Sequence, residues 1–339
     1  MAGWAIRVRA ILAAIASAVV ISCGAARAST HITFVTDWKA QAEHGGFYEA
    51  QALGLYAREG LDVRILEGGP NVNVPQLLAA GAADFGIGSN GFIPLNLLRE
   101  GAPIKAVMAV FQKDPQVLIS HVRADVKSLA DMRGKPIMIS DASISAFWPW
   151  LKARYRFDDT QIRKYTFNLA PFLVDRKAIQ EGYLTSEPYT IASQGHVAAR
   201  VFLLADYGYP GYADMVLVPQ KWIVANPRAV QGFVNATREG WRRYLFADPA
   251  PANALIKRDN PEMTDGVIAQ AIAKMKSYGL VTSGDAASPG IGAMTEARWK
   301  IFFETMSSEG LYDRKLPWRN AFDLRFIARG ADGPPAAHR

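Results

Sequence analysis

The sequence is poor in the side chains that perform most covalent and metal chemistry. Its 339 residues include one cysteine, Cys23, in an N-terminal segment that we expect to be removed. The mature chain would then form no disulfide, thiol nucleophile or thiolate metal site. The five histidines show no H-x-x-x-H or H-E-x-x-H spacing, and the G-x-S-x-G and S-x-x-K motifs are also missing. These patterns predict no metal site and no catalytic residue, although a Ser-His-Asp set assembled only in space stays open.

Dense positive charge is absent too. The formal net charge is +7, from 38 basic and 31 acidic residues, and no block of lysine and arginine occurs. Removing residues 1–28, which hold three arginines and no acid, lowers the charge to +4. A nucleic-acid partner is therefore not expected.

The N-terminus has the layout of a secretory signal peptide. Arg7 and Arg9 precede an apolar run at 10–22, which is shorter than the ~20 residues that span a bilayer. Small residues lead up to Ala28, so we expect residues 1–28 to be cleaved there and the mature protein to be periplasmic. The stretch Val20–Cys23 also fits a lipoprotein signal, which leaves lipidation at Cys23 as the alternative.

Strand-like and helix-like runs then alternate along the chain. Apolar runs at 31–36, 61–66, 83–88 and 104–110 predict strands, and helical spacing predicts helices at 47–59, 72–80 and 92–100. A second such series follows, and after residue 221 the pattern is almost entirely helical. This rhythm predicts an α/β fold of two lobes, each a mainly parallel sheet with helices on both faces. We expect the second lobe to be inserted into the first, with these boundaries: signal peptide 1–28, lobe 1 first part 29–118, lobe 2 119–213, lobe 1 second part with C-terminal helices 214–329, and a disordered tail 330–339.

Aromatic and polar residues gather where the predicted strands end. Ligands of parallel sheets bind at the carboxyl ends of the strands, and flat apolar faces with a few donors and acceptors suit a planar small molecule. The candidate ligand-binding residues are Asp37, Trp38, His44, Asn71, Ser89, Asn90, Gln112, Ser143, Trp148, Asn168, Glu187 and Tyr189. Of the tryptophans in 147–150, we expect one to pack inward and one to face the cleft.

Residues Gly86–Gly91 match the G-x-G-x-x-G fingerprint of dinucleotide sites. The loop follows the third predicted strand rather than the first, and a soluble dinucleotide is a poor cofactor outside the cytoplasm. The alternative is a tight turn whose backbone N–H groups, with Ser89 and Asn90, face a ligand. We expect no cofactor.

Five stretches resemble one family: DWKAQAEHGGFYEAQALGLYAREGLDV at 37–63, GGPNVNVPQLLAAGAADFGIGSN at 68–90, FQKDPQVLIS at 111–120, SLADMRGKPIMIS at 128–140 and GYLTSEPY at 182–189. They resemble periplasmic substrate-binding proteins of ABC importers, in the branch with NMT1/THI5-like and nitrate, sulfonate and taurine binders. The resemblance implies a type II two-lobed clamp. It also implies a monomer that passes its ligand to a permease and ATPase, and C-terminal helices packed on lobe 1.

Within this branch the chain looks most like binders of a thiamin pyrimidine precursor, formylaminopyrimidine or hydroxymethylpyrimidine. Sulfonate, taurine or nitrate binding is one alternative; a purely sensory clamp is another. A third is a THI5-like pyrimidine synthase that uses pyridoxal phosphate, but the lysine and histidine of that enzyme fall at Gly88 and Phe92 here. We therefore expect a binding protein and not an enzyme.

The resemblance also suggests roles at the ligand. Trp38 would stack on the pyrimidine and Glu187 would accept from its amino edge, although Glu187 also suits the first turn of a helix. Gly45 and Gly46 would let the backbone approach the ligand where a helix begins.

Overall fold

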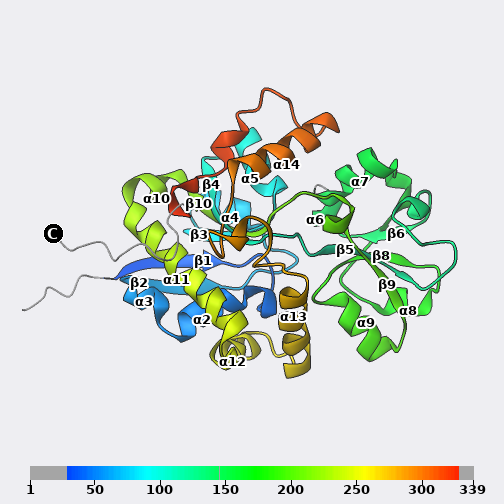
Figure 1. Ribbon diagram of the computed structural model, residues 1–339, viewed down its shortest axis with the longest axis horizontal. Helices are drawn as coiled ribbons and strands as arrows, with labels where there is room; N and C mark the ends of the chain where they lie inside the picture. The colour runs from blue at the N-terminus through cyan, green and yellow to red at the C-terminus, as the bar shows by residue number, and fades with distance from the viewer. Residues whose placement is uncertain (1–28, 145, 328–339) are drawn as a thin grey trace, which may run out of the picture.

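The computed structural model describes residues 29–144 and 146–327, which form two α/β lobes side by side (Figure 1). The strand order is β2-β1-β3-β10-β4 in lobe 1 and β7-β6-β8-β5-β9 in lobe 2. The lobe 1 strands are β1 (Thr30–Val35), β2 (Leu61–Leu66), β3 (Phe85–Asn90), β4 (Ile104–Phe111) and β10 (Ala213–Pro219). The lobe 2 strands are β5 (Gln116–His121), β6 (Ile137–Ile139), β7 (Ile162–Lys164), β8 (Ile179–Tyr183) and β9 (Ala199–Leu203). The predicted fold class is confirmed.

One strand in each sheet runs against its neighbours. β10 is antiparallel to β3 and β4, and β5 is antiparallel to β8 and β9. These are the first strands after the two crossings between lobes, at residues 112–115 and 204–212. Because β5 lies wholly in the second sheet, the first crossing comes before Gln116 and not at the expected boundary of 118/119.

Helices cover the sheets of both lobes. The α-helices are α2 (Gly45–Ala52), α3 (Leu55–Arg58), α4 (Val74–Ala80), α5 (Phe92–Arg99), α6 (Asp141–Ile144), α7 (Phe147–Tyr155), α8 (Ala170–Val174), α9 (Glu187–Gly195), α10 (Gln220–Ala225), α11 (Pro227–Phe246), α12 (Ala250–Asp259), α13 (Asp265–Ser277) and α14 (Glu296–Ser308). Short 3-10 helices include η1 (Ala42–His44), η4 (Leu204–Tyr207) and η6 (Trp318–Ala321). Within the described ranges, no helix combines the length and apolar character needed to cross a membrane.

The C-terminal helices pack on lobe 1, as expected. α11 and α12 lie against α2, while α13 contacts η1 of lobe 1 and α9 of lobe 2 (Figure 1). α13 therefore bridges the two lobes at one side of the cleft. The expected signal peptide 1–28 and tail 330–339 lie outside the described residues, as do residues 328 and 329.

Gly45 and Gly46 serve helix packing, not approach to a ligand. A Cβ on Gly46 would lie 2.1 Å from Cγ of Trp241, and one on Gly240 would lie 2.2 Å from the Gly46 carbonyl oxygen. α2 and α11 therefore cross at a contact that only glycine allows. The expectation that this pair exposes backbone to the ligand is wrong, because Trp241 and Tyr244 fill that space.

Candidate functional site

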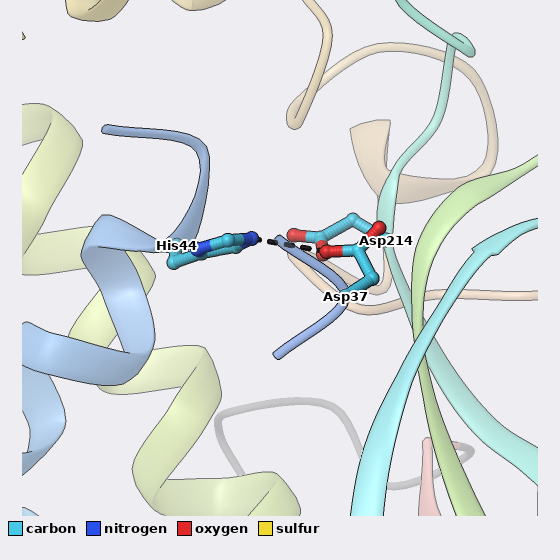
Figure 2. A group of neighbouring side chains, drawn as sticks. All are labelled: Asp37, His44 and Asp214. Atoms are coloured by element: carbon cyan, nitrogen blue, oxygen red, sulfur yellow. Dashed lines mark hydrogen bonds and ion pairs between the residues drawn. The ribbon is translucent and has the colours of Figure 1, made fainter. Parts of the chain in front are cut away.

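Asp37, His44 and Asp214 point toward one another on the face of lobe 1 that meets lobe 2 (Figure 2). They come from the loop after β1, from the end of η1 and from β10. His44 Nε2 donates to Asp37 Oδ1 at 3.1 Å, and one ligand atom from each of the three residues lies within 4.8 Å of the others. Three segments far apart in sequence thus build one polar cluster.

The cluster is buried and strongly acidic. The side chain of His44 is 1% exposed and that of Asp37 is 21% exposed, while Asp214 as a whole is 4% exposed. Burial raises the pKa of Asp214 well above its usual range, and the charges of Asp37 and Glu43 raise it further. Burial also raises the pKa of Glu43. The charged groups that act on Asp214 are therefore both acids, and the Asp214 Oδ2 atom has no hydrogen-bond partner within the described ranges.

Contacts between the lobes close over this cluster. Thr185, which follows β8, donates through Oγ1 to Glu43 Oε1, and its carbonyl accepts from Gln270 on α13. The Trp38 ring packs on Phe167 of lobe 2, with ring centroids 4.5 Å apart. Tyr183 lies at the end of β8, and burial and the charge of Asp114, then of Asp37, raise its pKa well above the usual range. The two lobes therefore meet through polar and aromatic side chains directly beside Asp37 and Glu43.

Two residues at this surface hold a backbone conformation that L-residues avoid. Asp214 has φ 50° and Phe167 has φ 62°. Such strain amounts to about 1–3 kcal/mol per residue and gathers at ligand clamps and active sites. The left-handed backbone at Asp214 aims its carboxylate into the cluster although the residue lies within β10.

A model of the NMT1/THI5-like family matches residues 41–252, which is more than half of the chain. The chain belongs to this family. The riboflavin-binding protein RibY of Chloroflexus aurantiacus is 26% identical over 309 residues, which cover 88% of this chain and 87% of that protein. The formylaminopyrimidine-binding protein of Halalkalibacterium halodurans is 23% identical over 65% of this chain and 68% of its own length.

Enzymes also occur among the relatives. A 4-amino-5-hydroxymethyl-2-methylpyrimidine phosphate synthase of Legionella pneumophila is 22% identical over 69% of this chain and 75% of its own length. Among solved structures, the periplasmic aliphatic sulphonate binding protein SsuA of Escherichia coli superposes with a TM-score of 0.65 at 16% identity, covering 87% of this chain and 92% of that one. That similarity establishes the periplasmic-binding-protein fold for this family member.

The positions expected for the lysine and histidine of the pyrimidine synthases lie in the interior of lobe 1. A Cβ on Gly88 would lie 3.0 Å from Leu217 Cδ1, so β3 packs closely on β10 there. Phe92 is buried and its ring centroid lies 5.2 Å from that of Phe302. Neither position presents a reactive side chain in this member of the family.

The other predicted site residues are spread over both lobes. Asp37, Trp38 and His44 meet the second lobe as described above. Tyr189 is half-buried on α9, and its hydroxyl approaches Gly266 of α13. Ser143 is half-buried on α6 and accepts from the Ser140 hydroxyl at 3.0 Å.

Glu187 is committed to bonds inside lobe 2. Its carboxylate accepts from the Tyr183 N–H at 2.7 Å and from the Tyr165 hydroxyl at 3.3 Å. Glu187 also begins α9, so the alternative of an acid in the first helical turn describes its position. Burial raises its pKa, and the charge of Glu43 raises it further.

Other predicted residues support the structure around them. Asn90 accepts from the Phe92 N–H and Asn168 accepts from the Ala170 N–H, so each holds the start of a helix. Ser89 is half-buried at the end of β3, and Asn71 is exposed in the turn before α4.

Gln112 and Trp148 point into the cores of their own lobes. The Gln112 amide donates to the carbonyls of Ala109 and Ala293 at 3.1 and 2.9 Å. Trp148 is fully buried and donates to Asp159 at 2.9 Å. Trp150 is fully buried as well, so the expectation that one tryptophan of this run faces the cleft is wrong.

Sequence reasoning missed Glu43, Asp214, Tyr183 and Thr185. Asp214 stands at the start of an apolar strand, where an acid is commonly an exposed boundary residue. Tyr183 and Thr185 lie within the quoted stretch at 182–189, in which only Glu187 and Tyr189 were chosen as candidates. The signal that could have found Asp214 was its place directly after the second crossing between the lobes.

Proposed function

We propose that this protein is an extracytoplasmic substrate-binding protein of an ABC importer that captures a small heteroaromatic molecule, a thiamin pyrimidine precursor, between its lobes. The observation that carries the proposal is the acidic cluster beside Trp38. Asp37, Glu43 and Asp214 gather there with His44 as the one basic side chain among them. The ligand is thus expected to offer hydrogen-bond donors to these oxygens and a flat face to the aromatic pair.

An aminopyrimidine has both features. Its exocyclic amino group donates two hydrogen bonds, and a ring nitrogen donates another when protonated, while carboxylates accept only. Charge-assisted bonds of this kind are about twice as strong as neutral ones. The Trp38 ring, already paired with Phe167, supplies an aromatic surface beside these acceptors.

An anionic ligand does not suit this cleft. A sulfonate or nitrate placed here would either meet like charge or keep these acids protonated, and the cluster of Asp37, His44 and Asp214 offers it no lysine or arginine. The sulfonate, taurine and nitrate alternatives are therefore disfavoured for this protein despite the shared fold.

Two named relatives support the class of ligand. One is a formylaminopyrimidine-binding protein, which favours the thiamin pyrimidine precursor. The other is a riboflavin-binding protein whose similarity spans most of both chains. Riboflavin is therefore the second candidate, since its flavin ring is also a flat heteroaromatic system.

The remaining parts of the proposal follow from this role. The protein acts outside the cytoplasm as a monomer, after export by residues 1–28 or as a lipoprotein anchored at Cys23. It hands its ligand to a permease served by an ATPase and makes or breaks no bond. The packed interior at Gly88 and Phe92 supports a binding protein over a pyrimidine synthase.

Thermal unfolding of the untagged mature chain tests the proposal. A ligand that binds only the folded state at about 100 times its Kd adds about 2.7 kcal/mol of stability, which raises the Tm by several degrees. We expect this rise with formylaminopyrimidine or hydroxymethylpyrimidine, with and without EDTA, and no rise with an alkanesulfonate. A rise with the sulfonate and none with any pyrimidine or riboflavin would refute the ligand class.

A further inference from the structure

We propose that Asp37, His44 and Asp214 bind one divalent first-row transition-metal ion, with Zn²⁺ as its representative. The three residues offer one imidazole nitrogen and two carboxylate oxygens within 4.8 Å of one another (Figure 2). Imidazole suits zinc, iron, nickel and copper, and carboxylates suit the harder end of the same row. This donor set contains no sulfur, so it does not favour a soft monovalent ion.

Asp214 supplies an independent observation that points to a cation. The residue is 4% exposed, its carboxylate is aimed into the cluster, and its Oδ2 atom has no hydrogen-bond partner within the described ranges. A buried carboxylate oxygen without a partner is costly, and a bound metal ion would provide the missing interaction.

The spacing of Asp37 and His44 fits a metal better than an organic ammonium group. Asp37 Oδ1 and His44 Nε2 are 3.1 Å apart. An ion about 2.1 Å from each atom would subtend an angle of about 95° between them, which lies between the ~90° of octahedral and the ~109° of tetrahedral coordination. At an ammonium nitrogen about 2.8 Å from each atom, the angle between Asp37 Oδ1 and His44 Nε2 would be only about 67°, whereas ammonium N–H bonds diverge by about 109°.

The three protein ligands alone do not complete the coordination of the proposed ion. Three protein ligands leave one position open in a four-coordinate zinc site. Asp37 is the most exposed of the three side chains, so the open position is expected on its side, toward the cleft. Thr185 of lobe 2 reaches Glu43, the neighbour of His44, which places the second lobe next to the proposed ion.

A second histidine–aspartate pair serves as a matched control. His31 Nδ1 and Asp62 Oδ2 are also 3.1 Å apart, but their side chains are 59% and 66% exposed. No third carboxylate or histidine of the described chain joins this pair in a metal-ligand cluster. Asp62→Asn therefore removes a similar contact without touching the proposed site.

The test measures metal binding by the untagged mature chain after it has been stripped with EDTA. Zn²⁺ and Mn²⁺ are titrated in by calorimetry, and bound metal is counted by mass spectrometry after dialysis. We expect about one ion per chain. Even outer-shell partners of a metal contribute about 10–100-fold to affinity, so Asp214→Asn is expected to weaken binding at least about ten-fold, while Asp62→Asn leaves it unchanged.

Folding is checked in the same samples by circular dichroism. Asp214→Asn keeps the size of the side chain and tolerates the same left-handed backbone, so it should fold, and His44→Asn gives a second test if it does not. Absence of stoichiometric metal in the wild type, or wild-type affinity in the folded Asp214→Asn variant, would overturn the inference. The metal inference would also be overturned if the wild type takes no metal and Asp214→Asn loses pyrimidine binding. The acids would then contact an organic donor. Metal binding without any heteroaromatic ligand would refute only the proposed function.

Discussion

Asp114 lies in the first crossing between the lobes, and replacing it with asparagine is expected to stabilise the protein at neutral pH. The residue is 3% exposed, and its carboxylate accepts from the Gln116 N–H at 3.0 Å. Burial raises its pKa from 3.8 to about 7, and the single hydrogen bond offsets this only in part. Asparagine keeps an acceptor oxygen for Gln116 and cannot ionise.

The sign and size of the effect follow from proton linkage. Between about pH 4 and pH 7 the folded protein keeps a proton on Asp114 that the unfolded chain has released, so folding becomes less favourable as the pH rises through this window. A difference of about three pKa units, at about 1.4 kcal/mol each, amounts to about 4 kcal/mol. Asp114→Asn lacks this loss. Its advantage over the wild type is therefore expected to grow by about 4 kcal/mol from about pH 4 to about pH 8.

Urea unfolding followed by tryptophan fluorescence measures this difference at a series of pH values. Other buried carboxylates, such as Glu181 with a pKa of about 7, titrate in both proteins and cancel in the comparison. The exposed Asp62→Asn variant serves as control and should follow the wild type. A difference between Asp114→Asn and wild type that does not change with pH would refute the reasoning.

Three further predictions concern packing and the cleft. Gly46→Ala drives a methyl group into Trp241 and is expected to lower the free energy of unfolding by about 1–3 kcal/mol or more in urea; an unchanged midpoint would contradict the packing described. Thr185→Val leaves the buried Glu43 carboxyl group without its hydrogen-bond donor from lobe 2. Ligand affinity measured by calorimetry should therefore fall by an amount equivalent to about 1–3 kcal/mol. An affinity equal to that of the wild type would contradict a role of Thr185 in closure of the lobes. Trp38→Ala should abolish ligand binding with an unchanged circular dichroism spectrum, whereas retained binding would exclude Trp38 from the site.

The fold could be predicted because its evidence is local. Alternating and continuous apolar runs indicate strands, and glycines after helical runs mark their ends, so β1 to β4 and the helices between them are visible in the sequence. The position of the first crossing was misplaced because β5 (Gln116–His121) is apolar enough to belong to either sheet. Only its pairing with β8 and β9 assigns it to lobe 2.

The candidate site was only partly predictable, because its residues come from segments that lie far apart in the sequence and meet only in the folded chain. Asp37, Trp38 and His44 were found because they share one loop and the start of a helix. Asp214 is separated from them by an entire lobe, and no spacing rule links it to His44. Motif searches for metal ligands do not detect such a cluster, since they find ligands on one helix or hairpin and not on three separate segments.

Long side chains near strand ends were the least predictable. The Gln112 amide nitrogen and the Trp148 indole N–H could each serve a ligand, yet both donate to acceptors in their own lobes. A buried amide or indole N–H must find a hydrogen-bond partner. A carbonyl or carboxylate within the same lobe provides one whether or not a ligand is bound. Position in a loop therefore says less about function than whether the side chain's bonds are already satisfied.

The backbone strain of Phe167 and Asp214 differs in origin from that of the other residues with positive φ. Four described residues other than glycine have positive φ: Arg156, Phe167, His196 and Asp214. Arg156 and His196 each follow the last turn of a helix, where a left-handed residue is a normal way to end it. Phe167 and Asp214 end no helix, and glycine would hold either backbone with less strain. Both instead carry side chains that meet the other lobe or the acidic cluster. Their strain is explained if the Phe167 ring and the Asp214 carboxylate are retained for what binds between the lobes, since packing alone would favour glycine at both positions.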